Sequence, residues 1–259
     1  MQVLLSDKNP LLKQVRRAVQ KGSLTDDGFA VAEGFHLLEE ALKSSAEIGA
    51  VIVAQSVTGA IESHVKGLKL RVATVRDADF GVLASTESPQ GVLALVKPPA
   101  WTLDQLLRGK SLVAVLDGIQ DPGNAGAILR AAEAFGATGA AFLKGSVSPY
   151  NPKCMRASAG SVFRLPIAAA LDESLLLAAL EKKRGVLYAA MPRAVRPVSD
   201  ANFKMSCAIV IGSEGRGVSH RLATSATPLR IPTNGVESLN AAVAAGILFY
   251  EARRQRNMT

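Results

Sequence analysis

Short apolar runs alternate with amphipathic stretches along the whole chain. Over the first hundred residues, amphipathic patterns such as GFHLLEEALKSS lie between strand-like runs, which are FAVAE, AVIVA, LRVATV and GVLALV. The stretch KNPLLKQVRRAVQKG predicts a helix, with Pro10 at its start and Gly22 at its end. Strands and helices that alternate in this way predict an α/β fold.

The second part of the chain repeats the alternation with more strongly apolar runs. Six segments predict strands: SLVAVLD, TGAAFLKG, FRLPIAA, GVLYAAM, CAIVIG and LRIP. Two segments predict helices, DESLLLAALEKKRG and NAGAILRAAEAFG, the latter with Asn124 as N-cap and Gly136 as its stop. Continuous apolar strands between helices predict a mostly parallel sheet that is covered on both faces.

The segment KPPAWT, at 97–102, supplies two prolines after the last strand of the first part. Proline-rich segments of this kind are typical of linkers. We therefore expect two domains, a smaller α/β domain at 1–98 and a larger one at 99–259.

Composition narrows the class of protein. Hydrophobic residues make up 48% of the 259, but the longest apolar run, AAVAAGILFY, is about half as long as a membrane-spanning helix. The first residues do not have the pattern of a secretory signal, so we expect a cytoplasmic protein without a membrane span. Cys154, Cys207 and the three histidines lack the spacing of a metal site, which predicts no metal and no disulfide.

The positive charge is confined to the second part of the chain. Residues 1–100 contain 11 Lys and Arg and 11 Asp and Glu, whereas residues 101–259 contain 19 and 11, so they carry the whole net charge of +8. Thirteen of those 19 cations are arginines, which suit bidentate recognition of phosphate and stacking on bases. The charge favours a nucleic-acid partner, with an ordinary solvated basic surface as the alternative.

Three loops between a strand and a helix are too polar and too rich in glycine to serve only as connections. They are LDGIQDPGNAGAILR (116–130), IVIGSEGRGVS (209–219) and IPTNGVESLN (231–240). Open α/β proteins bind ligands at the carboxyl ends of their parallel strands, so these loops predict a site. The chain contains neither GxGxxG nor GxxxxGK[ST], which argues against a dinucleotide or P-loop enzyme.

Each of these loops also has a purely structural interpretation. Asn124 and Arg130 are six positions apart and are expected to project from similar sides of their helix, yet they could be a cap and a surface residue. Glu214 could be a helix-start acid or a carboxylate that fixes a ligand. Pro232 ends the preceding strand and Ser238 could cap the last helix, but these roles leave an acid and two asparagines of the third loop unexplained.

Taken in this order, the three loops resemble the three motifs of the SpoU, or TrmH, family of RNA ribose 2′-O-methyltransferases in the SPOUT class. The resemblance covers the landmarks of residues 112–256, and it rests on NAGAILRAAEAFG, IVIGSEGRGVS and IPTNGVESLNAAVA. The first part resembles the family's substrate-binding domain, an α/β unit similar to a ribosomal protein, through AEGFHLLEEAL and SPQGVLALV. The resemblance implies a C-terminal domain with a parallel sheet and a deep trefoil knot, and a homodimer whose interface lies beside the active sites.

The resemblance also implies a cofactor, S-adenosylmethionine, and a set of site residues. The implied catalytic group is Asn124, Arg130, Glu214, Ser238 and Asn240. The implied cofactor-binding residues are Gly212, Glu214, Gly215, Ile231, Pro232, Ser238 and Leu239. The segment NPKCMRASAGSVFRLP, at 151–166, is similar to the family stretch between the first two motifs. This similarity implies RNA contacts by Lys153, Arg156 and Ser158, in addition to Arg130. An ordinary helix start at Asn151 and Pro152 is the alternative.

The chemistry suggests roles for four members of the catalytic group. A ribose 2′-hydroxyl must attack a sulfonium methyl in line, which is first a problem of positioning. Since a guanidinium keeps its proton up to about pH 12, we expect Arg130 to clamp a phosphate and to stabilise the developing alkoxide rather than to act as the base. Asn124 and Asn240 would orient Arg130 or the ribose, and Glu214 would fix its own loop.

The resemblance therefore implies an enzyme that transfers a methyl group from S-adenosylmethionine to a ribose 2′-hydroxyl of RNA. The first domain favours ribosomal RNA over transfer RNA. Two alternatives remain open, a transfer RNA 2′-O-methyltransferase and a non-catalytic RNA-binding or ribosome-assembly protein. The intact catalytic group argues against the second.

Overall fold

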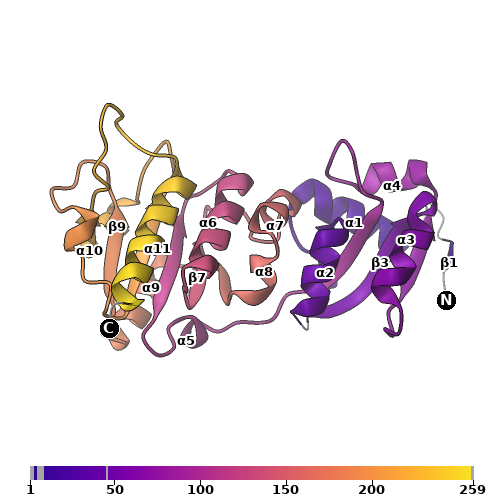
Figure 1. Cartoon of the computed structure of the whole chain (residues 1–259), viewed down its shortest axis with the longest axis horizontal. Coiled ribbons are helices and arrows are strands. Elements are labelled where there is room, and N and C mark those ends of the chain that lie inside the picture. Colours follow the sequence, from indigo (N-terminus) through magenta and orange to yellow (C-terminus); the bar gives the residue numbers. More distant parts are fainter. Residues whose placement is uncertain (1–2, 5–8, 45, 258–259) are drawn as a thin grey trace. The chain divides into compact units, whose positions relative to one another are not determined.

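The computed structural model describes residues 3–4, 9–44 and 46–257 of the chain. They form two compact units (Figure 1). The first runs to Ala100 and includes the later segment Tyr150–Arg164, and the second consists of Trp101–Pro149 and the chain from Leu165 onward. The segment 150–164 was expected in the second domain, but here it belongs to the first unit; the functional limits 1–98 and 99–259 stay a prediction.

The first unit is built on a mixed sheet of the order β1-β4-β3-β5-β2. Its strands are β1 (Val3–Leu4), β2 (Ala30–Glu33), β3 (Glu47–Ala54), β4 (Val72–Val75) and β5 (Val92–Lys97). β5 pairs antiparallel with β2 and β3, whereas β4 pairs parallel with β1 and β3. The helices are α1 (Pro10–Lys21), α2 (Phe35–Lys43), η1 (Gln55–Val57), α3 (Thr58–Val65), α4 (Asp77–Leu83), α7 (Pro152–Ser158) and α8 (Ser161–Arg164).

The predicted start and end of the first helix are confirmed. Pro10 is the first residue of α1, and the side chain of Asn9 before it accepts a hydrogen bond from the N–H of Leu11 at 2.9 Å. Gly22 ends the helix with a left-handed φ of 60°, a conformation that costs glycine little. The buried side of α1 packs on the sheet through Leu12 and Val15.

Two ion pairs attach α7 and α8 to the rest of the first unit. Arg156 lies 3.2 Å from the carboxylate of Glu33, whose side chain is only 4% exposed, and Arg164 pairs with Glu40. Glu33 also accepts hydrogen bonds from the backbone N–H of Ser85 and from the hydroxyls of Ser85 and Thr86. A buried carboxylate requires partners of this kind, which explains why 150–164 joins the first unit.

The second unit is built on a parallel sheet of the order β11-β9-β10-β6-β7-β8. Its strands are β6 (Leu112–Asp117), β7 (Gly139–Leu143), β8 (Ile167–Leu171), β9 (Val186–Ala190), β10 (Cys207–Gly212) and β11 (Thr227–Leu229). Its helices are α5 (Leu103–Leu106), α6 (Pro122–Ala134), α9 (Glu173–Lys182), η2 (Val198–Asp200), α10 (His220–Ser225) and α11 (Ala241–Asn257).

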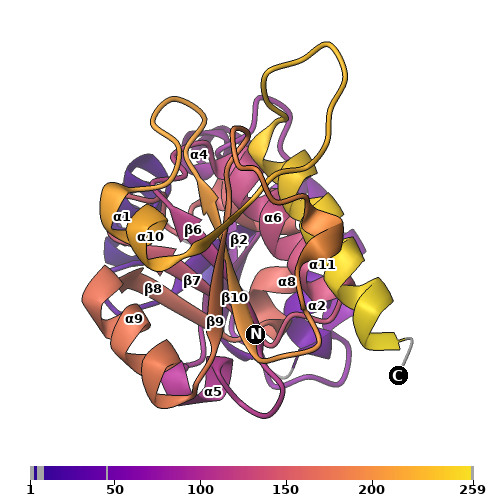
Figure 2. The ribbon, with the colours of Figure 1, turned by 90° about the vertical axis from the view of Figure 1, so that its left-hand side faces the viewer.

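Helices cover both faces of this sheet. Figure 2 shows α6 and α11 on one face and α9 and α10 on the other. The central strand β6 is buried over its whole length, as its continuous apolar run requires. The predicted α/β fold with a parallel sheet is confirmed, while the predicted knot stays a prediction.

Three predicted boundaries in the second unit are wrong, namely the end of the last strand, the start of α6 and the start of α11. The last strand ends at Leu229 instead of running through LRIP, because the N–H of Arg230 turns to the carbonyl of Arg196. The N-cap of α6 is Asp121, whose carboxylate accepts a hydrogen bond from the N–H of Asn124 at 2.7 Å. Asn124 is therefore the third residue of the helix rather than its cap.

The last helix begins later than Ser238 would allow. The side-chain oxygen of Asn240 accepts hydrogen bonds from the N–H groups of Ala242 at 2.9 Å and Val243 at 3.3 Å. Asn240 is thus the residue that caps α11, in place of the predicted Ser238.

In the part of the chain that the structure describes, no helix has both the length and the apolar character that crossing a bilayer requires. Cys154 and Cys207 are both buried, and neither forms a disulfide. Burial raises the pKa of the Cys207 thiol to about 11, although the nearby Arg256 acts in the opposite direction. This thiol is neutral at physiological pH and belongs to the core.

Arg256 fastens the end of α11 to the amino ends of the central strands. Its guanidinium donates to four backbone carbonyls at 2.8 Å, those of Lys110, Ser111, Phe203 and Met205. Such a fork of donors is specific to arginine.

We expect Arg256→Ala to lower the free energy of unfolding by about 2 kcal/mol, because it leaves these carbonyls without their donors. Urea unfolding followed by circular dichroism measures the change. Arg253→Ala, which removes an exposed arginine from the same helix, serves as the control and should change the stability by less than about 0.5 kcal/mol. Equal effects of the two substitutions would contradict this role of Arg256.

Candidate active site

The three glycine-rich loops meet at the carboxyl edge of the parallel sheet. β6 and β10 pair in register up to Asp117 and Gly212, so the loops that follow them start side by side. The loop after β11 extends from the same end of the sheet, as Figure 2 shows. The three loops that the sequence singles out therefore start from one edge of the sheet.

One side chain from each loop joins a hydrogen-bond network. The amide nitrogen Nδ2 of Asn124 donates to Oε1 of Glu214. Nδ2 of Asn240 donates to Oδ1 of Asn124 at 3.0 Å and lies 3.5 Å from Oε1 of Glu214. The carboxylate thus accepts from both amides, and Asn124 serves as donor to one partner and acceptor to the other.

The backbone positions each member of this network and, for Asn240, also orients the side-chain amide. Asn240 gives its Oδ1 to the N-terminus of α11, so its Nδ2 faces the other two side chains. Asn124 is held by α6, and Glu214 lies in a tight turn closed by a 2.8 Å hydrogen bond from the N–H of Gly217 to the carbonyl of Ser213. Local structure therefore determines the assignment of the amide oxygen and nitrogen of Asn240, and the two partners of Asn124 then determine its own.

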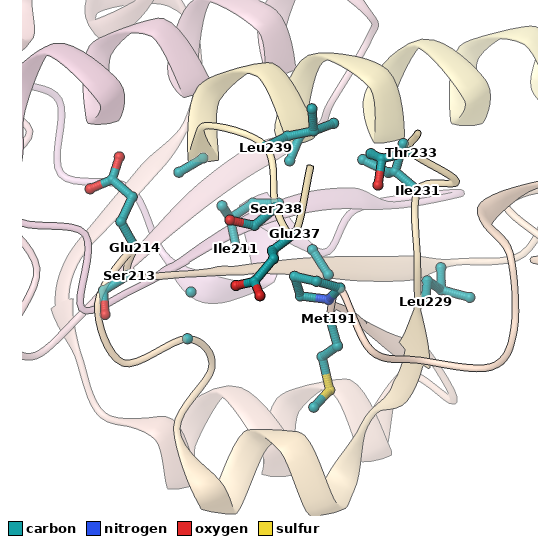
Figure 3. A pocket seen from close by; sticks show the side chains of 16 residues that line it. Met191, Ile211, Ser213, Glu214, Leu229, Ile231, Thr233, Glu237, Ser238 and Leu239 are labelled. Atoms are coloured by element: carbon teal, nitrogen blue, oxygen red, sulfur yellow. The ribbon is translucent and has the colours of Figure 1, made fainter. Parts of the chain in front are cut away.

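A pocket lies beside this network and is bounded by the loops after β9, β10 and β11. Figure 3 shows Ser213 and Glu214 at one end, Leu229, Ile231 and Thr233 at the other, and Glu237 and Ser238 between them. Its apolar lining consists of Ala190, Met191, Pro192, Ile211, Leu229, Ile231, Leu239, Ala241 and Ala244. An apolar wall with a few polar groups is typical of a small-molecule site.

Gly212 allows the loop after β10 to fold back on its own strand. A Cβ atom at this position would lie 2.3 Å from the backbone carbon of Gly217, closer than any side chain tolerates. The pocket wall at Ser213–Gly217 therefore depends on glycine at 212.

The structure brings together five of the seven residues predicted to bind the cofactor, since Gly212, Glu214, Ile231, Ser238 and Leu239 line this pocket. Two predicted residues are placed elsewhere. Gly215 lines a neighbouring hollow, and Pro232 is not part of the lining.

The sequence reasoning missed the wall formed after β9, which consists of Ala190, Met191 and Pro192. The pattern of GVLYAAM predicts a strand and no site, although β9 lies next to β10 in the parallel sheet and its carboxyl end faces the same pocket. The proline that follows it was the available signal.

Arg130 is not part of the network. It is exposed, and its guanidinium forms no hydrogen bond or ion pair with another residue in the described ranges. Six helical residues correspond to about 9 Å along the axis and leave a difference of about 120° around it, so the prediction that Asn124 and Arg130 project from similar sides is wrong. Arg130 is thus available for a partner outside this chain.

The predicted RNA contacts at 151–166 lie in the first unit. The predicted helix start at Asn151 and Pro152 is confirmed in α7. Lys153 is exposed, whereas Arg156 is engaged with Glu33 and the hydroxyl of Ser85. Ser158 is wrong as a contact residue, because its side chain is buried and its hydroxyl donates to the carbonyl of Met155 at 2.7 Å.

No cluster of three or more His, Cys, Asp or Glu side chains that could hold a metal ion occurs among the described residues.

Comparison with known proteins identifies both parts of the chain. Residues 111–250 match the model of the SpoU rRNA Methylase family, and residues 9–94 match that of the MRM3-like substrate binding domain. An uncharacterized tRNA/rRNA methyltransferase of Synechocystis sp. is 32% identical over 98% of this chain and 94% of its own length. The 23S rRNA (guanosine(2553)-2′-O)-methyltransferase RlmP of Bacillus subtilis is 31% identical over 98% of this chain and all of its own.

The fold has counterparts among solved structures. The AdoMet-bound rRNA methyltransferase from Sinorhizobium meliloti superposes with a TM-score of 0.83 at 27% identity, and the match covers 98% of each chain. The likeness therefore extends over both units and not only over the parallel sheet.

Proposed function

The chain belongs to the SpoU rRNA methylase family, and from that premise we propose that it transfers a methyl group from S-adenosylmethionine to a ribose 2′-hydroxyl of ribosomal RNA. The observation that carries this proposal is the Asn124–Glu214–Asn240 network beside a pocket built from the three loops. Such a site holds two reactants next to each other, which is the main requirement of an in-line transfer.

The pocket residues fit the cofactor. The apolar side chains of Ile211, Ile231 and Leu239 suit the adenine ring, and Ser238 and Glu237 offer partners for its polar groups. When bound, S-adenosylmethionine supplies an electrophilic methyl group on a sulfonium sulfur. The rRNA methyltransferase from Sinorhizobium meliloti has been solved with AdoMet bound, which supports the assignment.

Each member of the network has a positioning task. Glu214, which accepts hydrogen bonds from both amides, fixes the loop after β10, and this loop forms one wall of the cofactor pocket. Asn124 and Asn240 orient the ribose or the arginine that approaches it, because their rotamers are set by one another and by α11. Arg130 clamps an RNA phosphate near the target and stabilises the charge that develops on the ribose oxygen.

Ribosomal RNA is favoured over transfer RNA by the first unit. Residues 9–94 match a substrate-binding domain, and the Bacillus subtilis relative is named for a guanosine of 23S ribosomal RNA. Transfer RNA is the alternative substrate, since other relatives carry names that mention both classes.

Two measurements test the proposal. Calorimetry should show binding of S-adenosylmethionine, and label from its methyl group should pass to transcripts of 23S ribosomal RNA but not to transfer RNA. Mapping of ribose methylation in ribosomal RNA from cells with and without the gene then locates the nucleotide. Binding without transfer to any RNA would favour a non-catalytic assembly protein and contradict the proposal.

We also infer a homodimer that forms through α11. Val243, Ile247 and Tyr250 lie on one stripe of this helix and are 51%, 36% and 57% exposed. Tyr250 contacts the ring of Phe135 at the end of α6, so the stripe continues toward the helix that carries Arg130. A second copy bound on this face would cover these side chains and lie beside the active site.

We expect Ile247→Arg to raise the dissociation constant of the dimer by at least about 100-fold, because each interface would bury two unpaired charges. Sedimentation equilibrium measures the change. Val195→Arg places the same charge at a valine that is 90% exposed outside α11 and should leave the dimer intact. A monomeric wild-type protein at micromolar concentration would refute the interface.

A further inference from the structure

A second hollow opens at the carboxyl edge of the parallel sheet. Its volume is about 420 Å³, within the range of small-molecule sites, and it lies between the ends of β6 and β7 and the turn after β10. It shares Ser213, Glu214 and Gly217 with the first pocket, so a single turn of chain separates the two.

The lining of this hollow is polar, in contrast to the apolar wall of the first pocket. Its acids already have partners within the chain, because Asp117 accepts the N–H of Ser219 at 2.6 Å and Glu214 accepts both amides of the network. Its two cations, Lys144 and Arg216, are exposed. The guanidinium of Arg216 is exposed and has no partner within the described part of the chain.

Lys144 adds a second positive charge at the rim. Its Nζ lies 3.1 Å from the carboxylate of Asp172, yet 69% of its side chain remains exposed. The carboxylate of Asp172 also accepts two hydrogen bonds from Ser174, so it keeps hydrogen-bond partners when Lys144 binds another anion. The donors that the hollow leaves available are therefore those of an anion site.

We propose that this hollow receives a nucleotide of the substrate RNA adjacent to the methylated ribose, with its phosphate on Arg216 and Lys144. The inference rests on the proposed function and deepens it, because the shared wall at Ser213–Gly217 places this nucleotide directly beside the cofactor pocket. The exposed side-chain amide of Gln120 offers a donor and an acceptor to the remainder of the nucleotide.

Gly215 supports the same assignment. Its φ is not left-handed, and a Cβ atom built on it would meet nothing within 4 Å. The chain itself therefore does not require glycine at this position, whereas a polynucleotide that passes over the turn would require the open space.

The test compares Arg216→Gln, Lys144→Gln and the double variant with the wild type. Binding of transcribed 23S ribosomal RNA is measured by fluorescence anisotropy at several salt concentrations, and binding of S-adenosylmethionine by calorimetry. We expect the double variant to bind RNA at least about tenfold more weakly and to lower the slope of log K against log salt by about 0.7, which corresponds to the loss of one neutralised single-strand phosphate. The affinity for S-adenosylmethionine should not change.

Arg184→Gln is the matched control, because it removes an exposed arginine that precedes β9, at the amino end of the sheet. It should leave RNA affinity and salt slope unchanged. Gly215→Leu fills the hollow without a change of charge and should weaken RNA binding while the salt slope stays closer to that of the wild type.

Three results would overturn the inference: an unchanged RNA affinity in the double variant, a loss equal to that of Arg184→Gln, or a loss of cofactor affinity. Because the readout is RNA binding, it decides the inference even if no methyl transfer is found. Absence of transfer by the wild-type protein would count against the proposed function alone.

Discussion

Replacement of Arg130 by lysine is expected to lower the rate of methyl transfer to RNA by about 10²- to 10³-fold, as the loss of a transition-state donor does in other enzymes. Lysine keeps the positive charge and much of the length but not the planar fork that binds two phosphate oxygens at once. If Arg130 acts as a bidentate clamp, retention of charge alone does not preserve the rate.

The position of Arg130 allows its effect on the reaction to be separated from an effect on stability. The side chain is exposed on α6 and makes no hydrogen bond or ion pair within the described chain, so its replacement should leave the unfolding free energy within about 0.5 kcal/mol. A change in rate can then be assigned to the reaction rather than to the fold. Single-turnover label transfer, with RNA at saturation, separates the chemical step from binding.

Arg253→Lys on α11 is the matched control, because it makes the same exchange at another exposed arginine. It should retain the wild-type rate. Full methyl transfer by Arg130→Lys with unchanged RNA affinity would contradict the clamp, and the charge on the ribose oxygen would then have to be stabilised by other groups.

The strands of the second unit were predictable because burial on both faces demands apolar residues without interruption. CAIVIG and SLVAVLD became β10 and β6, and both are buried almost throughout. Helix starts were less predictable. Asp121 and Asn124 are both good caps, and the choice between them depends on which residue has extended backbone, as Asp121 does with its ψ of 118°.

The site was predictable as a set of loops but not as a set of contacts. Glycine and polar residues after apolar strands marked two of its walls, whereas the wall after β9 depends on strand order, which the sequence does not show. The ion pair of Arg156 with Glu33 could not be predicted from the sequence either. Glu33 is 123 positions away, and only the folded first unit reveals that the carboxylate is buried and needs a cation.

Asn124→Asp is expected to lower methyl transfer by at least about 10²-fold, although it changes the side chain by a single atom. The amide nitrogen that donates to Glu214 would become a carboxylate oxygen directed at another carboxylate. Two such charges at hydrogen-bonding distance repel each other by about 1–5 kcal/mol, depending on the local dielectric constant. The turn that carries Glu214 would move away, and the amide of Asn240 would lose one of its two acceptors.

A second substitution shows whether the network acts by position or by charge. In Asn124→Asp with Glu214→Gln, a glutamine amide can donate to the new carboxylate, so the same bond forms with its polarity reversed, and Asn240 still has an acceptor at position 124. We expect this double variant to transfer methyl groups at least tenfold faster than Asn124→Asp alone. Asn124→Asp with Glu181→Gln, which removes an exposed acid of α9, makes the same change in net charge and should recover none of it. If the first double variant stays as slow as Asn124→Asp alone, the reaction needs the negative charge of Glu214 itself, since the restored hydrogen bonds would then hold the loop without restoring the rate.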